Sequence, residues 1–372
     1  GSSLNIAIGV GALDSFNVGS GNGYNVAIGD QAGGQVTTGV QNTLIGGLAG
    51  DAITTASNNT AVGYSSLSAN TTGTENTAFG MNSSLGNTTG NYNAAFGKGT
   101  LATNTTGSQN TAIGTNSLQS ATTADNNTGV GYFALQANTT GASNTAVGEA
   151  SLDANTTGSE NTAVGKGALS SNTTASNNTA VGNSALLANT TGDENTAIGR
   201  LALVDNTTGT DNTALGYQAM TSNTTASNNV SIGRKSMLSN TTGAKNTVVG
   251  AQALDANSTG DNNTAVGYQA LSTNTTANNN TAFGFQALLD NTTGTDNVAM
   301  GVLALENNTT GINNVGIGRE ALGANTTANA NTAVGYAALL SNTTGTQNVG
   351  IGSLALVANT TGIENVAVGV EA

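Results

Sequence analysis

The sequence predicts an all-β fold, a parallel β-solenoid or β-roll of about 21 coils. Three observations support this prediction. A 17-residue unit recurs along nearly all of the 372 residues. In a short stretch of each unit, side chains of two kinds alternate from one residue to the next, which is the period of a β-strand. The unit is rich in Thr, Asn and Gly, which are poor helix formers.

The unit can be read from "NTAVGYQALSTNTTANN", residues 263–279, which is followed at once by "NTAFGFQALLDNTTGTD". We number the positions of each unit from its first Asn. Units begin at Asn5, Asn25 and Asn42, and then every 17 residues to Asn365. The first step is 20 residues, so 1–41 is predicted to form divergent N-terminal coils with one three-residue insertion in 14–24. The segment 42–372 is predicted to be one continuous regular solenoid.

Within each unit, "TAVG" predicts a short strand, and "ALxxNTT" predicts a second short strand with a corner. Stacked coils would lie ~4.8 Å apart, which gives a rod on the order of 100 Å long. Position 4 is always apolar and position 9 is mostly Leu, so both are predicted to form buried ladders. This predicted core ladder includes Val62, Leu67, Val147, Leu152, Val266 and Leu271. The Asn residues at positions 1 and 12 are predicted to stack as amide ladders.

Position 5 is Gly in every unit, which indicates either a positive φ angle or a close backbone approach that leaves no room for a Cβ. These repeat glycines include Gly63, Gly80, Gly97, Gly114, Gly148 and Gly267. All charged residues fall at positions 6, 7, 10, 11, 16 and 17. The charges therefore mark the outside of the coil.

Composition argues against several classes of function. The net charge is −13 with only seven basic residues, which excludes a Lys/Arg footprint for nucleic acid and disfavours an anionic membrane surface. No apolar run is long enough to span a membrane, and the first residues show no signal-peptide pattern. There is no His and no Cys, so we expect no enzyme, no cofactor and no metal site.

The Asn-Thr-Thr corners allow two interpretations. Asn70, Asn87, Asn104 and Asn138 begin Asn-x-Thr triplets and are candidate glycan-bearing residues in a host that glycosylates. They are also typical turn residues that bond their own backbone. Thr71, Thr88 and Thr105 start a column that suggests an alternative function, an ice-binding or glycan-binding solenoid with stacked Thr and Asn ladders.

The motif "NTAVGYQAL…NTTG" resembles the repeats of phage-type tail-fibre proteins, and "NIAIG", "NVAIG" and "NTAIG" are similar to the head repeats of trimeric autotransporter adhesins. The resemblance covers essentially the whole chain. It implies a left-handed parallel β-roll and a homotrimer. It also implies a structural fibre shaft or adhesin stalk, extracellular, on a cell surface or in a virion, that presents a tip domain binding a host glycan or receptor.

A coil this thin holds little apolar core, which favours packing against copies of the same chain. The small residues at positions 3 and 8, such as Ala146, are expected to lie at the contact between chains. We expect three parallel chains in register, and the exposed ends of the solenoid allow further end-to-end polymerisation.

Overall fold

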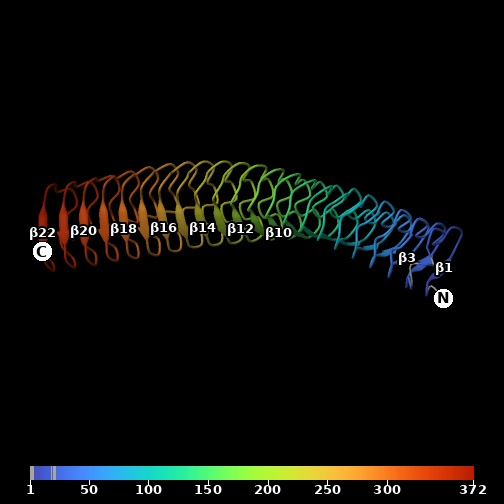
Figure 1. The fold of residues 1–372 in the computed structure, drawn as a ribbon. Coiled ribbons are helices and arrows are strands. Elements are labelled where there is room, and N and C mark those ends of the chain that lie inside the picture. Colours follow the sequence, from blue (N-terminus) through green and yellow to red (C-terminus); the bar gives the residue numbers. More distant parts are fainter. Residues whose placement is uncertain (1–3, 18, 20–21) are drawn as a thin grey trace. The chain divides into compact units, whose positions relative to one another are not determined.

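The computed structural model describes residues 4–17, 19 and 22–372 and divides them into two compact units, Gly1–Thr191 (unit 1) and Gly192–Ala372 (unit 2). Every coil of both units contributes one three-residue strand, and the described residues include no helix. This confirms the predicted all-β parallel solenoid with a 17-residue repeat. Within each unit the strands stack side by side in chain order (Figure 1).

The strands of unit 1 are β1 (Ile6–Ile8), β2 (Val26–Ile28), β3 (Thr43–Ile45), β4 (Thr60–Val62), β5 (Thr77–Phe79), β6 (Ala94–Phe96), β7 (Thr111–Ile113), β8 (Thr128–Val130), β9 (Thr145–Val147), β10 (Thr162–Val164) and β11 (Thr179–Val181). The strands of unit 2 are β12 (Thr196–Ile198), β13 (Thr213–Leu215), β14 (Val230–Ile232), β15 (Thr247–Val249), β16 (Thr264–Val266), β17 (Thr281–Phe283), β18 (Val298–Met300), β19 (Val315–Ile317), β20 (Thr332–Val334), β21 (Val349–Ile351) and β22 (Val366–Val368).

Within each unit, neighbouring strands pair in parallel, with each position opposite the same position of the next coil. In β9 and β10, for example, Ala146 pairs with Ala163 and Val147 with Val164. The predicted insertion in 14–24 lies partly outside the described residues. No structural boundary appears at residue 41, because β2 pairs with β3 in register across it.

The second predicted strand, at "ALxxNTT", is wrong. Positions 6 to 11 form turns in which positions 7 and 9 have positive φ angles, as at Ala150 (51°) and Leu152 (53°). These turns still bond to the next coil, since Leu152 N donates to Ala168 O (3.0 Å) and Ala154 N to Ser170 O (3.1 Å). Hydrogen bonds between coils therefore extend well beyond the short strands.

The core is built from positions 3, 8 and 9. Leu67, Leu152 and Leu271 at position 9 are fully buried, as predicted. The prediction that position 4 is buried is wrong: Val147 is 37% exposed, and Val62 and Val266 are half-buried. Within the strand, position 3 points inward instead, and it is buried in all described coils except the first and the last.

The physical reason is the narrow interior of the coil. A Cβ added at Gly316, at position 3, would lie 3.2 Å from Cγ of Leu305, the position 9 residue of the preceding coil. The Leu side chain therefore fills the interior from the turn side and leaves room only for a small residue on the strand. Because alternate strand residues point to opposite faces, position 4 then points outward. The expectation that positions 3 and 8 lie at a contact between chains is also wrong, because both are core positions.

Two buried amide ladders hold the coils in register. At position 1, Asn59 N donates to Asn42 Oδ1 (3.0 Å), and Asn59 Nδ2 donates to Asn42 Oδ1 (3.2 Å) and to Gly73 O (3.0 Å). At position 12, Asn87 Nδ2 donates to Asn70 Oδ1 (2.9 Å) and to Gly90 O (3.0 Å). Both ladders confirm the prediction from the repeat.

The repeat glycines satisfy both conditions that could require Gly. Gly148 has a φ angle of 136°, and a Cβ there would lie 2.6 Å from Gly165 O in the next coil. Gly63, Gly80, Gly97, Gly114 and Gly267 also have positive φ angles and leave a Cβ no room beside the next coil. Replacing the Gly at position 5 by any residue with a side chain would therefore strain the backbone and push two coils apart.

Candidate interaction surface

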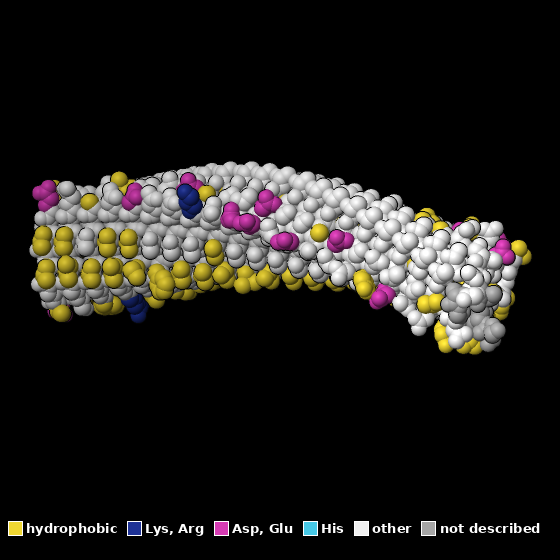
Figure 2. Space-filling view, viewed as in Figure 1, with side chains coloured by type: hydrophobic (Ala, Val, Ile, Leu, Met, Phe, Trp, Pro, Cys, Tyr) yellow, Lys and Arg dark blue, Asp and Glu magenta, His cyan; other side chains and the backbone are white. Residues whose placement is uncertain are grey.

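In each unit, the outward side chains of the strands form a continuous surface, which we call the outer strand face and define as positions 2 and 4. Position 2 is mostly Thr or Val, and position 4 is Val, Ile, Leu, Met or Phe in all 22 units. None of the position 4 side chains is buried. In unit 2 the two columns form two rows of hydrophobic side chains, one of them unbroken (Figure 2). An apolar column of this length is unusual on the surface of a soluble monomer.

Charged residues flank the outer strand face unequally. In unit 2 the edge before each strand, positions 16 and 17, carries six acids and one cation: Asp193, Glu194, Asp211, Asp261, Asp296, Glu364 and Lys245. The edge after each strand, positions 6 and 7, carries four cations and two acids: Arg200, Arg234, Lys235, Arg319, Glu320 and Glu371. We call these the acidic edge and the basic edge.

The acidic edge concentrates negative charge. When protonated, the exposed Glu194 carboxyl donates a hydrogen bond to the side chain of Asp211 on the next coil. This bond, followed by the charge of Asp211, raises the pKa of Glu194 above 4.5. Such a shift indicates that carboxyls on successive coils repel one another. A partner that brings positive charge to this edge would relieve the repulsion.

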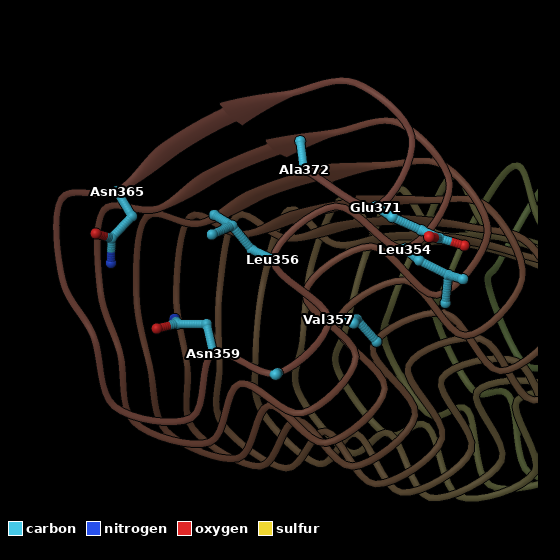
Figure 3. A pocket seen from close by; sticks show the side chains of 8 residues that line it. Leu354, Leu356, Val357, Asn359, Asn365, Glu371 and Ala372 are labelled. Carbon is cyan, nitrogen blue, oxygen red and sulfur yellow. The ribbon is translucent and has the colours of Figure 1, made fainter.

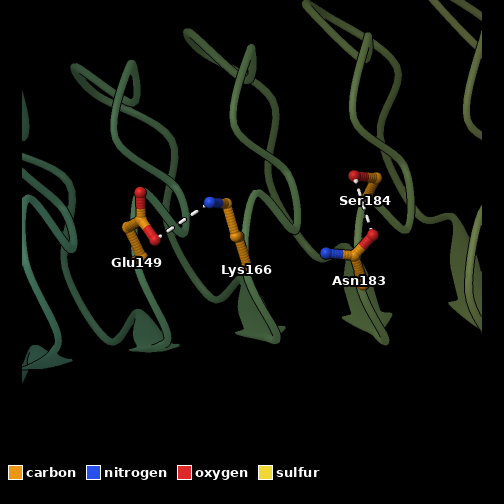
Figure 4. A network of polar contacts seen from close by, with 4 residues as sticks. All are labelled: Glu149, Lys166, Asn183 and Ser184. Atoms are coloured by element: carbon orange, nitrogen blue, oxygen red, sulfur yellow. Dashed lines mark hydrogen bonds and ion pairs between the residues drawn. The ribbon is translucent and has the colours of Figure 1, made fainter.

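Both ion pairs among the described residues lie at positions 6 and 7. Lys166 Nζ lies 3.0 Å from Glu149 Oε2 on the preceding coil, and Arg319 Nη2 lies 2.9 Å from Glu320 Oε1. Figure 4 shows the first pair spanning two coils. Most of these side chains are exposed, so each pair stabilises the fold by less than about 1 kcal/mol. Arg200 instead lies over the ring of Tyr217, 5.7 Å from its centroid.

Aromatic residues cluster on the outer strand face and at the basic edge. Phe79 and Phe96 at position 4 stack with centroids 6.2 Å apart, and Tyr268 and Phe285 at position 6 stack at 5.7 Å. All four rings are largely exposed. They extend the apolar surface rather than fill the core.

The proposed glycan-bearing residues are wrongly assigned. Asn70, Asn87, Asn104 and Asn138 are fully buried, and their amides donate to backbone carbonyls or to the ladder. A glycan on any of them is incompatible with the stacked coil. Exposed Asn residues that begin an Asn-x-Thr triplet lie at position 17 instead, at Asn58, Asn126, Asn177, Asn262 and Asn279, and at position 11, at Asn307. The signal that distinguishes them is their position beside the charged edge, outside both ladders.

The Thr column named from the sequence is largely engaged in the fold. Thr71 Oγ1 donates to Thr88 O (3.1 Å), and Thr88 Oγ1 donates to Thr105 O (2.9 Å), so these position 13 hydroxyls link coils. The exposed column is position 14, which is Thr in each of the 20 units from Thr38 to Thr361. Sequence reasoning placed the column one residue too early.

Two shallow depressions occur in the described residues. One, of about 280 Å³, lies beside Asp14, Gln31 and Asp51 in unit 1. The other, of about 400 Å³, is the open interior of the last coil, which the side chains of Leu356, Asn359 and Asn365 line (Figure 3). The same positions in other coils are covered by a following coil, so the second depression reflects coil geometry rather than a binding pocket.

Within the described part of the chain, no group of three or more acids gathers as a metal site would require. None of the described segments is a helix that could cross a membrane.

The fold defines this chain as a parallel β-solenoid repeat protein. Compared with known proteins, the chain matches no family model and no curated sequence.

Proposed function

We propose that this protein is a non-enzymatic structural shaft or stalk that associates with copies of itself, as a homotrimer, outside the cell, on its surface or in a virion. The observation that carries the proposal is the outer strand face, an apolar surface that runs from coil to coil. The proposal also draws on the resemblance to tail-fibre and adhesin repeats.

The extent of the face supports self-association. Eleven coils at ~4.8 Å and a strip about 10 Å wide give on the order of 500 Å² in each unit. Each unit alone therefore offers a large part of the roughly 800 Å² per partner of a standard stable interface.

Replacing Val147 and Val164 by Asp tests the proposal. Both side chains are 37% exposed, so the single chain should still fold, while two charges on each copy would disrupt an apolar interface. The matched control replaces Thr140 and Thr157 by Asp, which places the same charges on exposed side chains of two neighbouring coils, away from the face. Light scattering should give a multiple of the chain mass for wild type and control and the chain mass for the variant. A monomeric wild type at micromolar concentration would refute the proposal.

A second function, ice binding, is favoured only by the exposed Thr column at position 14. The Thr hydroxyls at the neighbouring position 13 donate to backbone carbonyls of the next coil. The position 14 column therefore has no second column of free Thr hydroxyls beside it. An assay of ice recrystallisation with the Thr140 and Thr157 control variant distinguishes the two functions. Inhibition by wild type that the control variant loses would support ice binding.

A further inference from the structure

We propose that the coils at Asn25 and Asn42 form a register lock, which fixes the order in which the coils of unit 1 stack and starts their folding. The lock is an exchange of large and small core residues within these two coils, residues 25–58. The inference concerns a single chain, so it does not depend on the proposed self-association.

A solenoid of nearly identical coils needs a feature that fixes the stacking order. In the regular coils, a small residue at position 3 packs beside the Leu at position 9 of the preceding coil. A Cβ added at Gly129, for example, would lie 3.4 Å from Leu118 Cγ. A regular coil makes the same contact with whichever regular coil precedes it, and both amide ladders still form. A chain that leaves out one coil as a loop of 17 residues keeps native-like contacts everywhere else, so it is a kinetic trap.

The coils at Asn25 and Asn42 exchange the sizes of these core residues. Position 9 is Gly in both coils, at Gly33 and Gly50, and position 3 of the second coil is the fully buried Leu44. A Cβ at Gly33 would lie 2.6 Å from Leu44 Cδ1, and a Cβ at Gly50 would lie 2.8 Å from Leu44 Cδ2. Leu44 therefore fills from the strand side the space that Leu fills from the turn side in the regular coils.

Position 12 departs from the repeat in the same two coils. Val36 and Ile53 are fully buried where the regular coils carry a ladder Asn. A Cβ at Gly50 would lie 2.8 Å from Ile53 Cδ1, so Ile53 also fills space that belongs to position 9 elsewhere. The position 12 ladder starts at the next coil, with Asn70. Core positions 3, 9 and 12 thus change together, and each change compensates for another.

These departures fit one stacking order. If the coil at Asn42 followed a regular coil, Leu44 would meet a second Leu at position 9 and overfill the core. If a regular coil followed Gly33, its small position 3 residue would leave a cavity. If Ile53 stood inside the position 12 ladder, an Asn amide of a neighbouring coil would lose its partner. The lock contacts are apolar and close in sequence, so they form before contacts between distant residues.

The order of folding in the wild type is the first test. Pulsed hydrogen exchange during refolding from urea measures when each backbone amide becomes protected. The amides of Gly33 and Gly50, which donate to Ala49 O and Ser66 O (both 2.9 Å), should be protected first. The matched amides in regular coils are those of Leu135 and Leu152, which donate to Ser151 O and Ala168 O (both 3.0 Å) and should follow later.

Two variants test whether the exchange of core residues is the cause. The unlocked variant converts the two coils to the regular pattern. The transplant variant adds the reverse exchange at the equivalent positions of the coils at Asn127 and Asn144. Leu already adopts the turn conformation of position 9 in the regular coils, with a φ angle of 53° at Leu152 against 59° at Gly33. The unlocked variant carries Gly33→Leu, Val36→Asn, Leu44→Ala, Gly50→Leu and Ile53→Asn, and the transplant variant adds Leu135→Gly, Asn138→Val, Ala146→Leu, Leu152→Gly and Asn155→Ile.

The unlocked variant should match the wild type in equilibrium urea unfolding, because it has the core and the ladder of regular coils. The fraction of its chains that regains the native exchange pattern should nevertheless fall by about half or more, because stacking orders now compete. The transplant variant should recover that fraction, with its first protected amides in the coils at Asn127 and Asn144.

Three results would overturn the lock: first protection outside residues 25–58 in the wild type, equal refolding of the wild type and the unlocked variant, or a transplant that leaves the first protected coils unchanged. If the unlocked variant does not fold at equilibrium, the order of protection in the wild type still decides. None of these measurements requires copies of the chain to associate, so a monomeric wild type would refute the proposed function and leave the lock intact.

Discussion

The position 12 ladder contains one defect, and repairing it should stabilise the protein. Asn104 Oδ1 is the one buried side-chain polar atom of the described residues without a hydrogen-bond partner. The next coil has Ala121 where the repeat has Asn, so the Nδ2 group that would donate is missing. On the following coil, Asn138 Nδ2 donates to Gly141 O alone. The change Ala121→Asn should complete the ladder on both sides.

The expected gain follows from the intact part of the ladder. In the coil at Asn155, Nδ2 donates to Asn138 Oδ1 (2.8 Å) and to Gly158 O (2.9 Å). The amide introduced by Ala121→Asn would donate to Asn104 Oδ1 and Ala124 O in the same way and accept from Asn138. Satisfying a buried acceptor is worth about 1–3 kcal/mol. Ordering a further side chain offsets part of this, so we expect a gain of about 1–2 kcal/mol in the free energy of unfolding.

Urea unfolding followed by circular dichroism measures the gain. The control is Ala121→Val, which fills space without hydrogen bonds, as Val36 does at the same position. A double-mutant cycle with Asn104→Ala isolates the new contact, since the gain should shrink when its acceptor is absent. Equal effects of Ala121→Val and Ala121→Asn, or no coupling to Asn104, would refute the reasoning.

Two further substitutions test other parts of the coil, each against a matched control. Gly148→Ala should destabilise the protein by about 3 kcal/mol or more, because the φ angle is 136° and the Cβ would lie 2.6 Å from Gly165 O. Gly167→Ala should cost about 1 kcal/mol or less, since its Cβ would meet nothing closer than 3.5 Å. Similar urea midpoints for the two would contradict the close-approach argument. Asn155→Asp should cost about 3–5 kcal/mol by burying a carboxylate in the amide ladder, while Asn177→Asp at the exposed edge should be nearly silent. A silent Asn155→Asp would contradict the ladder.

The sequence predicted those parts of the fold that depend on backbone geometry. A strict 17-residue period, an invariant Gly and recurring Asn at positions 1 and 12 are each required by one coil lying directly on another. Gly148 and Asn155 could therefore be assigned their roles without coordinates. Leu152 could also be placed in the core, because position 9 is Leu in most units and rarely changes in size.

The direction of the strand side chains could not be read from alternation alone. Alternation shows that Ala146 and Val147 point to opposite faces, but it does not show which face is inside. Size alone favours Val147 over Ala146 for the core, and this criterion gave the wrong answer. The informative signal was variation in volume: position 4 ranges from Val to Phe, whereas position 3 is mostly Ala, Gly or Ser. A close-packed interior tolerates little change of volume, so the more uniform position belongs inside.

The glycan assignment failed because it conflicted with a second prediction from the same residues. An Asn that donates both amide hydrogens within a stacked ladder has none left for a sugar linkage. Asn70 and Asn87 were expected to stack and were also named as candidates for glycans, and the two roles exclude each other. The turns at positions 7 and 9 were missed for another reason, since positive φ angles at residues such as Leu152 are rare and no propensity predicts them.

Stability should also depend on pH through Asp255, which stands at position 10 and accepts a hydrogen bond from Ser272 Oγ (2.6 Å). Partial burial raises the pKa of this carboxyl above 3.8, and the hydrogen bond from Ser272 opposes the shift only in part. The folded state therefore binds the proton more tightly than the unfolded state. The contribution of Asp255 to stability is greatest below pH 3.8 and is lost as the pH rises through the folded-state pKa. Asp255→Asn keeps the acceptor and removes the charge, so the variant should be more stable than wild type at about pH 7. The difference should shrink as the pH falls from the raised folded-state pKa to 3.8 and should be smallest below 3.8, and urea unfolding at about pH 7, 5 and 3 would measure it. A difference that stays constant over this range would show that the charge of Asp255 is not its cause.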